Sequence, residues 1–336
     1  MQFAHTLTAW YEENKRSLPW RGEHDPYKIW VSEIILQQTR VQQGWDYYLH
    51  FIEAFPNVRQ LAAATEEQVL RLWQGLGYYS RARNMHAAAQ QIMALHNGQF
   101  PNTYEEIRAL KGIGDYTAAA ISSIAFGLPH PAVDGNVLRI ISRIFGVCDD
   151  ISQAKTRKKI TEICEKLIDK GHPDTFNQAM MDFGATHCTP QNPQCSSCPF
   201  QKKCYALGHN LTDTLPLKSN KIVKRERRFH FVCYIYNNSI ILERRTNNDI
   251  WRNMYQFPMT ETSVADTLPN LHPSLSLRET LTHQIIHADF YIKPIGELPA
   301  LETEQILVPM EDIGKYPMPK IMVEFLKKAE LSNEQH

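Results

Sequence analysis

The chain has 336 residues, which is enough for about two domains. Hydrophobic residues make up 43% of it, and its 36 Lys and Arg residues balance 36 Asp and Glu residues. Sizeable cores can therefore be buried, and the charge balance argues against a large, diffuse nucleic-acid footprint but not against a local one. No apolar run of membrane-spanning length and no secretory signal occur, so we expect a cytoplasmic protein whose seven cysteines are thiols or metal ligands.

The first segment combines an amphipathic helix with an aromatic and basic turn. Residues 5–17 have helical periodicity, and Leu18, Pro19 and Trp20 follow. Arg16, Trp20 and Arg21 could form a group that stacks and donates hydrogen bonds. A tryptophan packed beneath a proline turn, with exposed arginines, explains the same residues equally well.

A second helix is predicted to begin at Asp25-Pro26 and to run to Gln38, because Asp is a good N-cap and Pro suits the first helical position. Glu33 lies among apolar residues on this helix. Burial would raise its pKa and suit it to general acid catalysis. The alternative is a glutamate on a solvated stripe. Gln37 and Gln38 extend a polar line that could face a cleft.

Residues 46–72 are predicted to be helical, and a turn with two glycines follows them. The turn brings Tyr78 and Tyr79 next to two arginines, a combination that suits stacking on bases and contact with phosphates. A packed tyrosine with solvated arginines is the alternative. The next predicted helix covers 83–96.

The stretch from Leu110 to Asn136 carries the central motif. Gly112 and Gly114 flank the apolar Ile113, as in a helix-hairpin-helix turn, and a strong helix start follows at Thr117. The free amides of that helix start would suit a phosphate. Asp134 comes near the far end of the same unit, so a carboxylate would lie one helix away from the phosphate anchor. An ordinary helix–loop–helix with an N-cap aspartate is the alternative.

Further helices are predicted over 136–148, 152–170 and 174–184, and no strand pattern precedes residue 226. The first two thirds of the chain are therefore predicted to be all-α.

Four cysteines follow in a proline-rich loop, with gaps of six, two and five residues between them: Cys188, Cys195, Cys198 and Cys204. Such a loop cannot bury a core of its own, and a metal centre would cross-link it. Four thiolates suit zinc or an iron–sulfur cluster. Zinc ribbons usually have two Cys-x-x-Cys pairs and this loop has one, so a four-iron cluster is favoured.

Residues 208–226 are predicted to be a linker that ends in a basic run. A β-hairpin is predicted around Asn237-Asn238, with further strands near 282–292 and 305–308 and helices near 261–268 and 318–329. The pattern predicts a second, α+β domain.

With these motifs assembled, the sequence resembles the MutY family of adenine DNA glycosylases within the endonuclease III, helix-hairpin-helix superfamily. The resemblance implies an all-α bilobed glycosylase domain over 1–207 with a [4Fe-4S] cluster loop at 188–204. It also implies an interdomain linker at 208–226 and a Nudix-like domain over 227–336. The cluster would be bound by the four cysteines and would be structural.

The resemblance also assigns roles. Glu33 would protonate adenine, Asp134 would stabilise the positive charge on the sugar, and Tyr116 would orient Asp134 by a hydrogen bond. Tyr116 replaces the lysine of members that also cleave the strand, so a monofunctional enzyme is expected. The adenine pocket would be lined by Arg16, Leu18, Trp20, Arg21 and Gln178.

Two departures from the family pattern concern the pocket. Gln178 replaces a glutamate of other members, so one contact to adenine would be a neutral amide. Leu138 stands where some members have a lysine that can trap the sugar, so such adducts are not expected.

The implied partner is double-stranded DNA that contains adenine opposite 8-oxoguanine or guanine, bound by a monomer in base excision repair. Residues matching DNA-contact positions are Gln37, Gln38, Tyr78, Gly112, Ile113, Gly114 and Thr117. In the second domain Leu281-Thr282-His283 matches a Phe-Ser-His loop that reads 8-oxoguanine, with Thr282 and His283 keeping a hydroxyl and the histidine. The glutamate cluster of Nudix hydrolases is absent, so this domain is expected to bind and not to hydrolyse.

Two rival functions remain. One is a superfamily glycosylase that removes thymine opposite guanine, against which Glu33 argues because thymine needs no acid. The other is a non-catalytic, cluster-bearing DNA sensor, against which the presence of both Glu33 and Asp134 argues.

Overall fold

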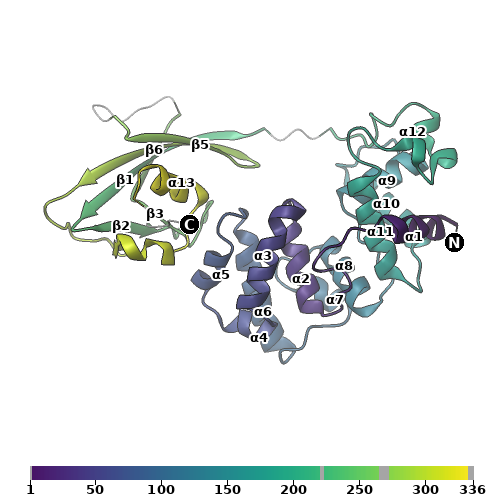
Figure 1. The fold of residues 1–336 in the computed structure, drawn as a ribbon, viewed down its shortest axis with the longest axis horizontal. Coiled ribbons are helices and arrows are strands. Elements are labelled where there is room, and N and C mark those ends of the chain that lie inside the picture. The colour runs from purple at the N-terminus through teal and green to yellow at the C-terminus, as the bar shows by residue number, and fades with distance from the viewer. Residues whose placement is uncertain (1, 220–222, 265–271, 332–336) are drawn as a thin grey trace. The chain divides into compact units, whose positions relative to one another are not determined.

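The computed structural model describes residues 2–219, 223–264 and 272–331. Its contacts divide the chain into two units, 1–63 with 84–220, and 64–83 with 221–336. Figure 1 shows a helical part at the N-terminal end of the colour scale and a sheet with a helix at the other end. No helix in the described ranges is long and apolar enough to cross a membrane.

The first unit is built from helices, and no strand precedes β1 in the described residues, as predicted. Its helices are α1 (Gln2–Asn14), α2 (Pro26–Leu36), α3 (Val41–Ala54), α4 (Val58–Ala63), α6 (Ser80–Leu95, which begins in the second unit), α7 (Tyr104–Ala109), α8 (Asp115–Phe126), α9 (Gly135–Phe145), α10 (Ala154–Leu167), α11 (Pro173–Thr186) and α12 (Tyr205–Gly208).

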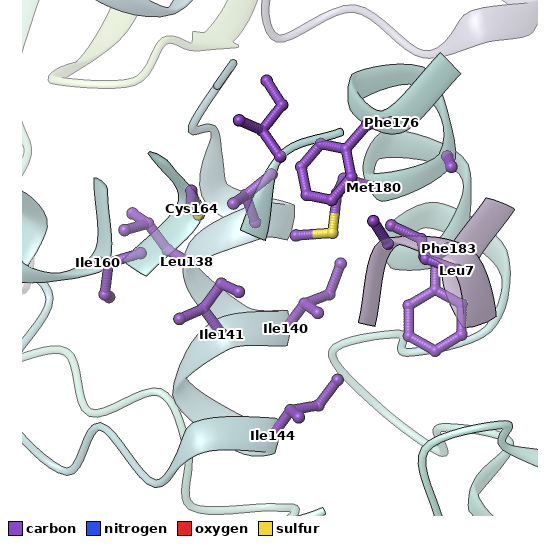
Figure 2. Close-up of a cluster of buried hydrophobic side chains, with 14 of the residues drawn as sticks. Leu7, Leu138, Ile140, Ile141, Ile144, Ile160, Cys164, Phe176, Met180 and Phe183 are labelled. Carbon is purple, nitrogen blue, oxygen red and sulfur yellow. The ribbon is translucent and has the colours of Figure 1, made fainter. Parts of the chain in front are cut away.

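One hydrophobic core joins four of these helices. Figure 2 shows Ile140, Ile141 and Ile144 along α9, with Ile140 on the side of Met180 of α11 and Ile141 on the side of Ile160. Leu7 of α1 and Ile160 of α10 belong to the same buried cluster. Burial of a large aliphatic side chain contributes roughly 1.5–3 kcal/mol, so this cluster holds the start of α9 in a fixed place.

The helix predicted over 46–72 is wrong as a single element, because the chain forms three helices there. The first ends at Ala54, before Phe55-Pro56, where the proline disfavours helical backbone in the residue before it. The third, α5 (Glu66–Leu72), begins with a capping box between Thr65 and Gln68.

The second unit contains a mixed sheet. The strand order is β3-β2-β1-β6-β5, with β4 also paired to β1 and β7 to β2. The strands are β1 (Arg225–Tyr236), β2 (Ser239–Arg244), β3 (Tyr255–Gln256), β4 (Met259–Thr262), β5 (Leu275–Thr280), β6 (Gln284–Pro294) and β7 (Gln305–Pro309). The pair β1 and β6 is parallel and the other pairs are antiparallel. Helix α13 (Lys320–Lys328) packs through Phe325, which stacks on Phe290 of β6 with ring centroids 4.2 Å apart.

The predicted hairpin around Asn237-Asn238 and the C-terminal helix are confirmed, because β1 pairs with β2 across that turn and α13 lies within 318–329. The helix predicted over 261–268 is wrong at its start, where Met259–Thr262 forms a strand paired with β1. Residues 265–268 of that prediction lie outside the described residues. Strands β3 and β5 were not predicted.

The turn between α7 and α8 requires glycine at one of its two glycine positions. Gly112 has φ +78°, and a Cβ there would lie 2.6 Å from Cβ of Asn84. Gly114 has φ −95°, and nothing lies within 4 Å of the position of its Cβ. The left-handed backbone that glycine allows is therefore used at Gly112 and not at Gly114.

We predict that Gly112→Ala lowers the free energy of unfolding by about 1–2 kcal/mol, because the left-handed backbone is strained for alanine and the Asn84 side chain must move. Gly114→Ala is the matched control and should change it by less than about 0.5 kcal/mol. Urea denaturation of the three proteins measures the difference. Equal stability of both variants would contradict this account of the turn.

Candidate active site

The helical unit encloses a cavity of about 510 Å³. Its lining includes residues of α2, α8, α9 and α11 and of the segment before α2. Ten residues predicted from the sequence line it: Arg16, Leu18, Trp20, Arg21, Glu33, Gln37, Gln38, Tyr116, Asp134 and Gln178. Folding thus brings together side chains that are up to 162 positions apart, from Arg16 to Gln178.

Glu33 is buried at the wall of this cavity, with only 8% of its surface exposed. The apolar helix α2 places it between Trp30, Ile34 and other buried residues. Burial raises the pKa of Glu33, and the hydroxyl of Tyr116, which donates to Oε2 at 2.8 Å, opposes that shift. The interpretation as a solvated helix face is wrong, because the carboxyl group is removed from bulk water.

Ionising Glu33 costs folding stability. A carboxyl group whose pKa is raised in the folded state contributes stability below its unfolded pKa, and that contribution is lost as the pH rises through the folded pKa. The fold therefore favours the protonated form of Glu33, which is the form that can donate a proton.

Asp134 is the N-cap of α9, as the alternative interpretation of this residue proposed. Its Oδ1 accepts from the amide of Val137 and its Oδ2 from Nδ2 of Asn136, both at 2.8 Å. Burial raises the pKa of Asp134, and these donors oppose the rise. The two carboxyl groups lie within electrostatic range, since Asp134 also raises the pKa of Glu33.

The expected hydrogen bond from Tyr116 to Asp134 is replaced by the one to Glu33. Burial raises the pKa of Tyr116 well above its usual value, so the hydroxyl stays protonated and acts as a donor. The tyrosine therefore stabilises the carboxyl group of α2 and not the cap of α9.

A series of hydrogen bonds connects Asp134, through Asn136, to Arg139. Arg139 is buried; its Nη2 donates to Oδ1 of Asn136 at 2.8 Å and to the carbonyl of Gly184 at 2.7 Å. Its Nε donates to the carbonyl of Cys188 at 2.8 Å. Asn136 and Arg139 were missed by the sequence reasoning. The sequence feature that could have indicated this role is an arginine, Arg139, among the apolar residues of the helix that follows Asp134.

Asp182 was missed as well. It is fully buried on α11, and its carboxylate accepts from Nε and Nη2 of Arg16 and from Nη2 of Arg21. The other terminal nitrogen of Arg21 donates to Oε1 of Gln178 at 2.6 Å. One buried carboxylate therefore fixes both arginines of the cavity. Its signal in the sequence was a lone acidic residue between Met181 and Phe183.

The hairpin residues border a second cavity, of about 780 Å³, which Tyr116 and Gln37 also line. Gly112, Gly114 and Thr117 are in its wall, but the side chains of Ile113 and Thr117 are buried. The Thr117 hydroxyl accepts from Nε2 of Gln37 at 3.2 Å. Gly114, the N-cap of α8, has no side chain to bond the first amides of the helix.

The four cysteines form a cluster beside the core that α9 and α11 share. Cys188, Cys198 and Cys204 pack against that core. Burial and then the neighbouring thiols Cys188 and Cys204 raise the pKa of Cys195, so the sulfurs lie within electrostatic range of each other. In the described residues no three His, Cys, Asp or Glu side chains are close enough to hold one metal ion.

Arg143 holds the cysteine loop against α9. It is buried, and its guanidinium donates to Sγ of Cys188 at 3.5 Å and to the carbonyls of Thr189, Pro190 and Leu215. These acceptors take up the hydrogen-bond donors of the buried Arg143 guanidinium, which forms no ion pair with an acidic residue in the described part of the chain.

Three predicted recognition residues belong to the second unit and not to the cavity. They are Tyr78, Thr282 and His283. The hydroxyls of Tyr78 and Thr282 form a hydrogen bond, and Tyr78, at φ +49°, is an exposed aromatic residue. His283 is exposed, and its carbonyl accepts from the amide of Arg225.

Comparisons with known proteins identify the family of the two domains. The family model for the HhH-GPD superfamily of base excision DNA repair proteins matches residues 31–166, and the NUDIX domain model matches residues 231–328. An adenine DNA glycosylase of Buchnera aphidicola subsp. Baizongia pistaciae is 35% identical over 300 residues, which cover 87% of this chain and 85% of the relative.

This chain belongs to the adenine DNA glycosylase family. It is accordingly an N-glycosylase of base excision repair. The predicted fold is confirmed, with a helical helix-hairpin-helix domain and a Nudix-like mixed sheet.

Two further matches bear on this family. The mouse adenine DNA glycosylase is 41% identical over 213 residues, which cover 61% of this chain and 41% of the mouse protein. A solved thermostable thymine-DNA glycosylase has a TM-score of 0.57 and 27% identity, and the match covers 62% of this chain and 96% of that chain. The helical scaffold is thus shared beyond adenine glycosylases.

Proposed function

We propose that the chain excises adenine that is mispaired with 8-oxoguanine or guanine in double-stranded DNA, as a monofunctional enzyme acting as a monomer. The observation that carries this proposal is the buried Glu33, whose pKa is raised and whose carboxyl group lies within electrostatic range of Asp134 at one cavity. An unmodified adenine leaves deoxyribose poorly unless its ring is protonated, so the enzyme needs an acid at neutral pH.

The two carboxyl groups take different roles in this proposal. Glu33 keeps its proton and gives it to a ring nitrogen of adenine as the glycosidic bond breaks. The sugar gains positive charge, as in other glycoside cleavages, and an ionised Asp134 stabilises it. Burial raises the pKa of Asp134, and three hydrogen bonds from Val137 and Asn136 oppose that rise, so these donors are the groups that would support the ionised form. Water then takes the place of adenine on the sugar.

Tyr116 supports the proposal that the enzyme leaves the strand intact. Cleavage by β-elimination needs an amine that forms a Schiff base with the sugar, and a phenol cannot form one. The hydroxyl instead donates to Glu33. Leu138, buried on α9, offers no amine either.

DNA binding is proposed through backbone amides and a few inserted side chains. The adenine must leave the stack of DNA bases at a cost of a few kcal/mol. A side chain inserted into the space that it leaves would stabilise the opened duplex. Gln37, Gln38 and Tyr78 are suited to that role, and Gln38 (φ +58°) and Tyr78 are exposed in left-handed backbone. The amides that begin α8, at Gly112 to Thr117, are proposed to hold a phosphate.

Recognition of 8-oxoguanine is assigned to Thr282 and His283 of the Nudix-like unit. The hydrogen bond between the hydroxyls of Thr282 and Tyr78 supports this assignment, because the residue proposed to read the base is then next to the aromatic residue proposed as a wedge. The proposed domain limits are 1–207 and 227–336 with a linker between them.

The four cysteines are proposed to hold a [4Fe-4S] cluster with a structural role. Their number, spacing and clustering beside α9 fit such a group. When bound, the cluster would cross-link the loop of 188–204. Arg139 and Arg143 would join that loop to the helix that Asp134 caps.

The thymine-removing alternative has one supporting observation, the scaffold shared with a thymine-DNA glycosylase. The buried acid Glu33 favours adenine. A non-catalytic sensor would not need two carboxyl groups at one cavity.

Incubation with a duplex that holds one adenine opposite 8-oxoguanine tests the proposal. We expect strand cleavage only after hot alkali, because alkali breaks the abasic site that a monofunctional glycosylase leaves. Glu33→Gln should slow base release about 10²- to 10⁴-fold, the range for loss of a general acid. Cleavage without alkali would overturn the monofunctional assignment, and no cleavage with either treatment would overturn adenine excision.

We predict that His283→Ala reduces the preference for 8-oxoguanine over guanine opposite adenine, since the opposite base loses a polar contact. Single-turnover rates on the two duplexes measure the preference. The exposed His272 offers a matched control, His272→Ala, which should leave the preference unchanged. A preference that is unaltered in His283→Ala would contradict the assignment of this loop.

A further inference from the structure

The basic run that ends the predicted linker continues into β1, where two of its arginines are used inside the sheet. Arg225 is exposed, but only 7% of the Arg227 side chain is exposed, and Arg228 donates to Oδ2 of Asp289 at 2.9 Å. A buried guanidinium cannot follow a phosphate backbone. Arg227 therefore needs an explanation other than direct contact with DNA.

Two carboxylates hold the guanidinium of Arg227 in place. Its Nε and Nη2 donate to the two oxygens of Glu261 at 2.8 and 2.6 Å. Its Nη1 and Nη2 donate to the two oxygens of Asp249 at 2.9 and 2.8 Å. The guanidinium carbon also lies over the ring of Phe229, 4.6 Å from the centroid. Two bidentate ion pairs fix the orientation of the planar group.

The fixed guanidinium also bonds the turn between β5 and β6. Its Nη1 donates to Oε1 of Gln284 at 3.2 Å, and Gln284 begins β6 directly after Thr282 and His283. A guanidinium can only donate hydrogen bonds, so the amide atom that faces it is the oxygen. This bond and the one from the Arg225 amide to the His283 carbonyl hold the C-terminal side of the turn.

The same ion pairs reach the chain segment that carries Tyr78. Asp249 lies in the loop between β2 and β3, and Asn253 of that loop donates through Nδ2 to Oε1 of Glu66 at 2.6 Å. Glu66 begins α5, in the segment 64–83 that belongs to the second unit and includes Tyr78. Arg227 thus connects the turn of β5 and β6 with the loop that holds this segment.

We propose that Arg227 is a positioning residue for recognition of the base opposite adenine. By fixing Gln284, it holds Thr282 and His283 at the place where the hydroxyl of Thr282 bonds that of Tyr78. Arg227 acts through these residues and does not touch DNA, because it is buried. The inference rests on the proposed function, in which this turn reads 8-oxoguanine.

The test is single-turnover release of adenine from duplexes with 8-oxoguanine or guanine opposite it, at saturating enzyme. Gln284→Met keeps the length of the side chain, removes the acceptor and leaves both ion pairs of Arg227 in place. The matched control is Gln305→Met, because Gln305 also begins a strand, is partly exposed, and accepts from the amide of Glu302 at 3.2 Å. Thermal melting of each variant confirms folding.

We expect Gln284→Met to lower the ratio of the two rates, 8-oxoguanine over guanine, roughly 3- to 10-fold, the effect of one hydrogen bond. The rate opposite guanine and the ratio in Gln305→Met should change little. Arg227→Lys keeps the charge but lacks the planar fork that bonds three partners at once, so it should lower the ratio too. Either variant carries the test if the other does not fold.

The double variant shows whether Arg227 acts through Gln284. Adding Arg227→Lys to Gln284→Met should lower the ratio no further, because both changes break the same connection. A further loss as large as that of Arg227→Lys alone would contradict the connection.

Two outcomes with Gln284→Met would also overturn the inference. Neither rate could change, which would mean that the turn keeps its place without Arg227. Both rates could fall by the same factor, which would make Gln284 a structural residue with no part in reading the opposite base. A wild-type protein with no preference for 8-oxoguanine would instead remove the assignment of this turn in the proposed function, and that result needs no variant.

Discussion

The structure of the site depends on one costly interaction, the burial of the Glu33 carboxyl group in an apolar helix. Water would stabilise the ionised form, whereas in the described part of the fold the carboxyl group accepts a hydrogen bond from the hydroxyl of Tyr116 on α8. Burial raises the pKa of Glu33, so ionising this group at higher pH costs folding stability. Helices α8, α9 and α11 and the segment before α2 supply further residues of the same cavity.

Buried polar side chains on α9 and α11 hydrogen-bond the residues that line the cavity and hold them in place. Asp182 fixes the two arginines of one wall, and Arg139 joins the cap of α9 to the cysteine loop. Each of these groups has its partners in a buried region of low dielectric, where hydrogen bonds and ion pairs are strong. Removing one partner there would strongly destabilise the fold. The same two helices carry the hydrophobic core of Figure 2. The packing of that core therefore also positions the polar side chains of α9 and α11.

The sequence predicts the helical fold and most of the cavity because these depend on local patterns. Helix caps at Asp25 and Asp134, the glycine pair and the cysteine spacing are readable from neighbouring residues. The missed features are long-range. Asp182 acquires its role only by pairing with Arg16 and Arg21 across the fold, and the hydrogen bond of Tyr116 goes to Glu33 because α2 and α8 pack together. Short strands such as β3 depend on their partners in the sheet, and periodicity does not reveal them.

A titration of the Glu33 carboxyl group tests the central claim most directly. Carbon-13 NMR of protein labelled at the glutamate side-chain carboxyl carbon, with Glu33→Gln used for assignment, follows this group through acidic and neutral pH. The account predicts a midpoint above the ordinary glutamate value of 4.5, because burial disfavours the charged form. A midpoint at or below that value would contradict the account, because burial would then not disfavour the charged form of Glu33.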